Sequence, residues 1–105
     1  MVTIEQVNNA RDHYFFTRMS ALRERIALNT AKTTLLTAEK MLLAKHPEDV
    51  RTLLEESRDV KQDNLALREI TCELGESRAE HAYDVLTILE NQWQRQQDEE
   101  QSDDN

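Results

Sequence analysis

The stretch Lys45-His46-Pro47-Glu48-Asp49 holds the only proline of the 105-residue chain, and the single glycine, Gly75, comes later. With no proline or glycine before this stretch, the sequence predicts one uninterrupted helix over residues 3–45. Proline suits the first turn of a helix, and acidic residues suit the positive end of the helix dipole, so a second helix is expected over residues 47–97. The stretch therefore predicts the bend of an all-α, long antiparallel helical hairpin.

The start of the first helix carries a local signature of its own. Thr3 and Gln6 have the spacing of a capping box, in which each side chain accepts a hydrogen bond from the backbone N–H of the other. Val2 and Val7 flank the box with the spacing of a hydrophobic staple. These four residues predict a helix that begins directly after Thr3.

Gly75 leaves two architectures open for the second half of the chain. Leu74-Gly75 is typical of a helix end, and the residues from Ser77 to Glu80 spell another capping box, so a three-helix bundle is the alternative. Against a break, a seven-residue repeat continues through the glycine. We expect one helix, kinked or continuous at Gly75.

Apolar residues at seven-residue spacing predict the contacts between the helices. The first helix carries two such rows, and a strip of this width indicates two neighbours, hence a dimer forming a coiled-coil or four-helix bundle. The first row is Tyr14, Ala21, Leu28, Leu35 and Leu42 with Ala31 and Ala38; the second is Phe15, Leu22, Leu36 and Leu43 with Met19 and Ile26. On the second helix the expected seam is Leu53, Val60, Leu67, Leu74, His81 and Ile88.

The charge distribution indicates where the domain ends and which partners the protein disfavours. Residues 1–46 carry seven Lys/Arg against four Asp/Glu, whereas residues 47–105 carry six against seventeen, and the chain has a net charge of −8. This acidity argues against direct binding to nucleic acid. We expect a single helical domain over residues 1–97 and an acidic disordered tail over residues 98–105, which hold no apolar residue.

The sequence also predicts a cytoplasmic protein that does not enter a membrane. No apolar run approaches the length of about 20 residues that crosses a bilayer, and the first residues lack the pattern of a signal peptide. Cys72 is the only cysteine, so no disulfide can form within the chain. These features agree with a reducing compartment.

Five carboxylates on the second helix form the most distinctive surface feature. Their spacings of four, three, four and four residues place them on one side of a continuous helix, and we call this set the acidic ridge: Glu69, Glu73, Glu76, Glu80 and Asp84. A solvated face that keeps the protein soluble is the simplest interpretation. The functional interpretation is a docking surface for a protein partner with a basic surface, with mimicry of nucleic acid as its extreme form.

A cluster of rings and cations on the first helix supports a different hypothesis. Rings beside guanidinium groups can stack on bases, so a helical oligomer that binds a small ligand or nucleotide is the alternative function. The candidate residues for ligand or secondary partner contacts are Arg11, His13, Tyr14, Phe16 and Arg18. Of these, Phe16 is expected to leave the apolar face and lie exposed.

No residue pattern supports an enzyme. One glycine excludes a glycine-rich phosphate loop, and His81 near Glu80 and Asp84 is the best available but weak metal cluster, so no metal, cofactor or catalytic residue is expected. The sequence thus predicts a non-enzymatic interaction protein: a regulator, inhibitor or assembly chaperone that forms a homodimer.

Overall fold

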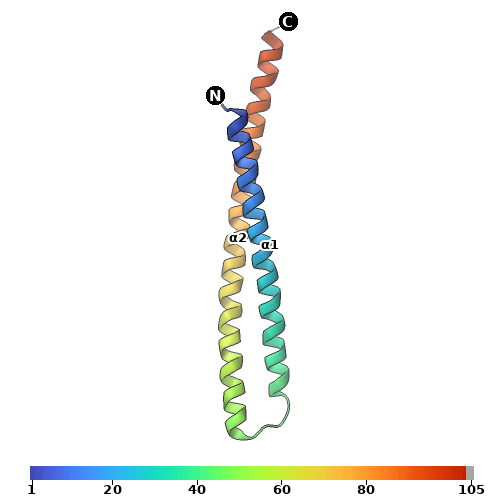
Figure 1. The fold of residues 1–105 in the computed structure, drawn as a ribbon, viewed down its shortest axis with the longest axis vertical. Coiled ribbons are helices and arrows are strands. Elements are labelled where there is room, and N and C mark those ends of the chain that lie inside the picture. The colour runs from blue at the N-terminus through green and yellow to red at the C-terminus, as the bar shows by residue number, and fades with distance from the viewer. Residues whose placement is uncertain (104–105) are drawn as a thin grey trace. The chain divides into compact units, whose positions relative to one another are not determined.

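The computed structural model describes residues 1–103, and in this part of the chain all regular structure is helical. Helix α1 spans Ile4–Leu42, with 39 residues, and helix α2 spans Glu48–Asp103, with 56 residues (Figure 1). The two helices run in opposite directions and are joined by one short bend. The predicted antiparallel helical hairpin is therefore confirmed.

The bend begins three residues earlier than the sequence suggested. Helix α1 ends at Leu42 rather than near Lys45, and the N–H of Leu43 donates to the carbonyl of Lys40 at 3.2 Å in a tightened last turn. His46 precedes Pro47, which disfavours the helical conformation there, and residues 43–45 are also outside the helix. The connection thus runs from Leu43 to Pro47.

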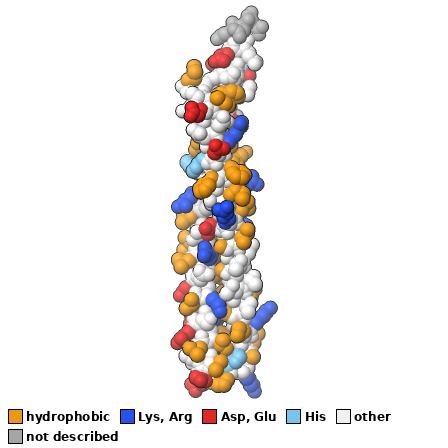
Figure 2. All heavy atoms as spheres, viewed as in Figure 1, with side chains coloured by type: hydrophobic (Ala, Val, Ile, Leu, Met, Phe, Trp, Pro, Cys, Tyr) orange, Lys and Arg blue, Asp and Glu red, His pale blue; other side chains and the backbone are white. Residues whose placement is uncertain are grey.

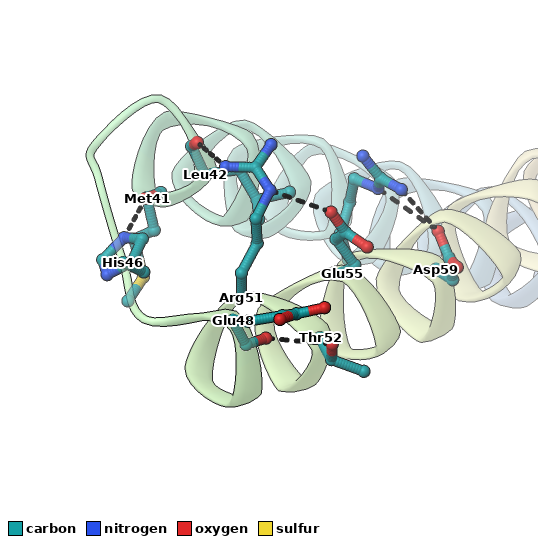
Figure 3. A network of polar contacts seen from close by, with 9 residues as sticks. Met41, Leu42, His46, Glu48, Arg51, Thr52, Glu55 and Asp59 are labelled. Atoms are coloured by element: carbon teal, nitrogen blue, oxygen red, sulfur yellow. Dashed lines mark hydrogen bonds and ion pairs between the residues drawn. The ribbon is translucent and has the colours of Figure 1, made fainter.

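Two side chains from beyond the helix satisfy carbonyls at the end of α1 (Figure 3). His46 Nε2 donates to the carbonyl of Met41 at 2.7 Å, and Arg51 Nη1 donates to the carbonyl of Leu42 at 3.5 Å. Arg51 Nε also binds Glu55 Oε1 at 3.1 Å, one turn along α2. The last carbonyls of a helix have no partner within it, so these contacts help to end α1 and to hold the bend.

The amino end of α1 has the predicted capping box. The N–H of Thr3 donates to Gln6 Oε1 at 2.9 Å, and the N–H of Gln6 donates to Thr3 Oγ1 at 3.2 Å. Val7, one residue further, is almost completely buried. This part of the local prediction is confirmed.

Helix α2 passes through Gly75 without a break, so the three-helix alternative is wrong. No described glycine has a positive φ, which a glycine that terminates a helix would need. The second capping-box pattern, at Ser77, lies inside the helix. A glycine inside a helix costs about 1 kcal/mol relative to alanine, a penalty that contacts along the rest of α2 can offset.

The carboxyl end of α2 extends beyond the expected boundary at residue 97. Residues 98–103 of the expected disordered tail are helical, and residues 104–105 lie outside the described residues. Gln94 Nε2 donates to Asp98 Oδ1 at 3.1 Å, which links the last predicted turn to the next one. A helix that is already nucleated extends by one hydrogen bond per added residue, so it can continue into polar sequence.

The hairpin comprises two compact units, which we describe separately. The terminal unit combines Met1–Ala21 with the chain from Gly75 onward, and the bend unit is Leu22–Leu74. Each unit contains one segment of α1 and one segment of α2.

The terminal unit is held by a small core and a few polar contacts between its two segments. Its buried side chains are Val7, Thr17, Ala21, Ala82 and Leu86. The rings of Tyr14 and Tyr83 lie with their centres 5.4 Å apart, at an angle of 53°. Near the chain start, the N–H of Val2 donates to Gln96 Oε1 at 3.0 Å.

The bend unit buries leucine and alanine side chains of α1 against a more polar face of α2. Its buried residues are Leu28, Ala31, Leu35, Ala38 and Cys72, with Leu54 and Leu65 half-buried. Glu24 and Arg68 face each other in an ion pair whose closest atoms are 3.8 Å apart. We call the residues that α1 and α2 present to each other the inner rows.

The inner row of α1 agrees with the first row expected from the sequence, but the seam expected on α2 is wrong. The predicted residues Leu53, Val60, Leu67, Leu74, His81 and Ile88 are all exposed. The residues that face α1 are mostly one or two positions away, and several are small, such as Cys72, Ala79 and Ala82. These small side chains share the inner position of α2 with leucines such as Leu65 and Leu86.

Candidate interaction surfaces

The acidic ridge lies on one unbroken helix, as the sequence-based hypothesis required. All five of its side chains are exposed, with Glu69 and Glu73 in the bend unit and Glu76, Glu80 and Asp84 in the terminal unit. In heptad terms Glu69, Glu73, Glu76 and Glu80 occupy the opposite flank of α2 from the exposed row that includes Leu67 and Leu74, whereas Asp84 lies one turn before Ile88 of that row. Helix α2 thus presents an acidic flank and an apolar flank.

One member of the ridge also borders α1. Glu80 lines a shallow groove of about 260 Å³ together with Tyr14, Arg18, Ala79 and Tyr83. Glu80 therefore lies close to side chains of α1 although it is itself exposed. The groove is smaller than the roughly 300–1,000 Å³ of typical ligand pockets.

Charge attraction between the helices is present in both units but weak. In the terminal unit Arg11 Nη2 and Glu90 Oε2 are 3.7 Å apart, and in the bend unit the pair of Glu24 and Arg68 is slightly longer. Partly exposed ion pairs of this kind contribute about 0–1 kcal/mol each. They therefore add little to the stability of the hairpin.

The arginine and aromatic cluster of α1 does not converge on one point. Tyr14 and Arg18 join at the groove, where Arg18 Nη1 donates to Tyr14 Oη at 3.2 Å, whereas Arg11 pairs with Glu90. His13 is exposed, and Phe16 is exposed as expected. Of the predicted ligand contacts, only Tyr14 and Arg18 thus lie at a common groove.

Figure 2 shows hydrophobic side chains at many points of the surface. Many of the large apolar side chains of α1 and α2 are exposed and recur at helical spacing. We call them the outer rows. The outer row of α1 is Phe15, Met19, Leu22, Ile26 and Leu36, followed by Leu43 in the bend, and the outer row of α2 is Leu53, Val60, Leu67, Leu74 and Ile88. The sequence pattern identified both rows but assigned the second one to the contact with α1.

Among residues 1–103, no group of three or more His, Cys, Asp or Glu side chains is placed to hold a metal ion. Neither α1 nor α2, as far as they are described, contains an apolar segment long enough to span a bilayer.

Comparison with known proteins adds no family assignment to this geometry. No protein-family model, no curated protein and no solved structure matches the chain.

Proposed function

We propose that this chain is a non-enzymatic protein–protein interaction protein that presents the acidic ridge to a partner with a basic surface. It acts in the cytoplasm as a regulator, inhibitor or assembly chaperone, and it self-associates, as the sequence predicted for a homodimer. The observation that carries the proposal is the set of five exposed carboxylates on one continuous helix.

The physical role of the ridge is to attract and select the partner. Like charges along one helix flank raise the negative potential there, and this potential accelerates encounters with a positive surface. Exposed charges contribute little affinity individually, so apolar contacts must add to the binding energy. Partner binding is therefore expected to weaken as salt screens the charges.

Charge reversal on the ridge tests the proposal. The triple variant Glu73→Lys, Glu80→Lys and Asp84→Lys removes three carboxylates, and the control variant Asp98→Lys, Glu99→Lys and Glu100→Lys makes the same charge change at exposed positions outside the ridge. The measurement is the amount of partner that each tagged full-length protein captures from its native cell extract, at low and at high salt.

We expect the ridge variant to lose at least tenfold in captured partner, whereas the control stays within about twofold of the unaltered protein; tenfold corresponds to about 1.4 kcal/mol. Circular dichroism checks that both variants keep their helix content. Equal capture by the two variants would show that the ridge is only a solvated surface.

A small-ligand function is the second candidate, supported by the groove beside Tyr14, Arg18 and Tyr83. A ligand that binds only the folded state raises the melting temperature, so a thermal-shift screen with nucleotides separates the two functions. A stabilising nucleotide whose effect disappears in Arg18→Ala would favour this second function. The groove's small volume favours the first.

A further inference from the structure

The bend unit exposes an apolar surface on both of its helix segments. On α1 the outer row contributes Leu22, Ile26 and Leu36, and Ile26 is 65% exposed. On α2 it contributes Leu53, Val60, Leu67 and Leu74, and Leu67 is 64% exposed. Burying such side chains against a partner removes apolar surface from water, so these rows can contribute strongly to the binding free energy of a complex.

Threonines make the α1 surface more apolar than its sequence suggests. The hydroxyls of Thr30, Thr33 and Thr34 each donate to the backbone carbonyl four residues earlier, at 3.0, 3.1 and 2.9 Å. Because these hydroxyls are already bonded within the helix, the threonines offer their methyl groups to a neighbour. They line a hollow of about 350 Å³ together with Ile26 and Asn29.

Such a hollow has the form that accepts a large apolar side chain from another helix. In coiled coils a side chain of one helix inserts between four side chains of the next. The outer row of α2 presents exposed leucine and valine side chains at seven-residue spacing, which is the repeat that such packing requires.

The charges that border the two rows are complementary. In the bend unit, residues 22–42 of α1 carry four Lys/Arg and two Asp/Glu, and residues 48–74 of α2 carry four Lys/Arg and eight Asp/Glu. On α1, Lys32 precedes Leu36 by four residues and so lies beside it on the helix surface. On α2, Glu56 and Asp63 stand in the same relation to Val60 and Leu67.

The opposite charges beside the α1 and α2 outer rows determine which rows pair. Two α2 rows would bring acidic borders together, and two α1 rows would bring basic borders together, whereas an α1 row against an α2 row joins opposite charges. The favoured contact is therefore between different helices of different copies.

We propose that the occupant of these rows is a second copy of this chain, with the α1 outer row of one copy packed against the α2 outer row of the other in the bend unit. This deepens the self-association included in the proposed function and names its surface. It is independent of the acidic ridge, whose residues in the bend unit lie on the other flank of α2.

A complementation experiment with two full-length variants tests this pairing. Ile26→Glu places a charge in the α1 row, and Leu67→Glu places one in the α2 row; both positions are exposed, so the hairpin itself tolerates them. Thr37→Glu and Gln62→Glu are the matched controls, because they add the same charges to exposed positions outside the rows. Sedimentation gives the mass of each protein alone and of equimolar mixtures.

The unaltered protein and both controls are expected to form particles of two or more chains. Each row variant alone should sediment as one chain. Both copies then carry the same altered row, and every proposed contact between an α1 row and an α2 row includes it. Their equimolar mixture should form a particle of two chains, since the intact α2 row of the first variant meets the intact α1 row of the second.

Three results would overturn the proposal: an unaltered protein that stays a single chain, a mixture that stays monomeric, or either variant that still associates alone. The last result would indicate pairing of like helices. Partner capture through the ridge is measured separately with the same two variants. If the variants lose self-association but still capture the partner, only the pairing of the rows is tested and the proposed partner function is unaffected. If they still self-associate but no longer capture the partner, the proposed partner function is wrong.

Discussion

The inner and outer rows of this hairpin differ in the size of the side chains that they use. The inner rows bury many small residues, including Ala31, Ala38, Cys72 and Ala82, whereas the outer rows leave leucine, isoleucine and phenylalanine side chains exposed. Within a single hairpin, leucines such as Leu28, Leu35 and Leu86 are buried beside these small residues, but many other large apolar side chains are not. The difference teaches that the hairpin leaves many of its large apolar side chains exposed, and the proposed self-association would explain this exposure.

The largest effect that distinguishes the rows is the loss of an inner leucine. Leu28→Ala is expected to lower the free energy of unfolding by about 2–4 kcal/mol, because it leaves a cavity between the helices. Ile26 lies two residues earlier, in the outer row, and Ile26→Ala is expected to change the free energy of unfolding by less than about 0.5 kcal/mol. Urea unfolding at a concentration where the chain is monomeric measures both. Equal losses would mean that the two rows do not differ in burial.

The ion pair of Glu24 and Arg68 lies between the inner rows. Replacing its carboxylate is expected to change the free energy of unfolding by less than the loss of Leu28, and in the opposite direction. Glu24 Oε2 is buried and has no hydrogen bond, and its ion-pair partner, Arg68 Nη1, is 3.8 Å away. Replacing a poorly compensated charge with an apolar side chain often stabilises a protein, so Glu24→Leu is expected to raise the free energy of unfolding by about 1 kcal/mol. The paired variant Arg68→Leu should lower it, since it leaves the carboxylate without its partner.

Thermal unfolding of the two variants checks this prediction. A melting temperature that falls in Glu24→Leu would show that the ion pair stabilises the inner rows, rather than merely fixing the alignment of the two helices.

The smallest expected differences in stability are those at the two capping-box patterns. Thr3→Ala removes an observed cap and is expected to cost about 1 kcal/mol, whereas Ser77→Ala should cost less than about 0.5 kcal/mol because Ser77 lies inside a continuous helix. Circular dichroism melts of the two variants compare them directly. A larger loss for Ser77→Ala would indicate that a helix begins there and would restore the three-helix alternative.

The local chemistry of the fold could be predicted from the sequence. Pro47 with its acidic neighbours placed the bend, and the pairing of Thr3 with Gln6 placed the start of α1, because both depend on residues adjacent in the chain. Gly75 was ambiguous, since its local signals favoured a break and only the contacts of the whole helix could decide.

The interface between the helices was predictable on α1 and not on α2. On α2 the large residues Leu53 and Leu67 fit a seven-residue repeat better than the small residues Cys72 and Ala82, yet the small ones face α1. Periodicity identifies which residues share a side of a helix but does not say which neighbour that side meets. The acidic ridge was identified correctly as an exposed row, whereas its closeness to Arg18 at Glu80 depends on packing.

Self-association of the unaltered chain is the central claim about this protein, and it can be measured directly. Sedimentation velocity over a dilution series from about 100 to about 1 µM covers complexes of moderate affinity, because a dissociation constant of 1 µM corresponds to about −8.2 kcal/mol. We predict particles of two or more chains at the upper concentrations that dissociate on dilution. A single chain at every concentration would contradict the assignment of the outer rows to a second copy.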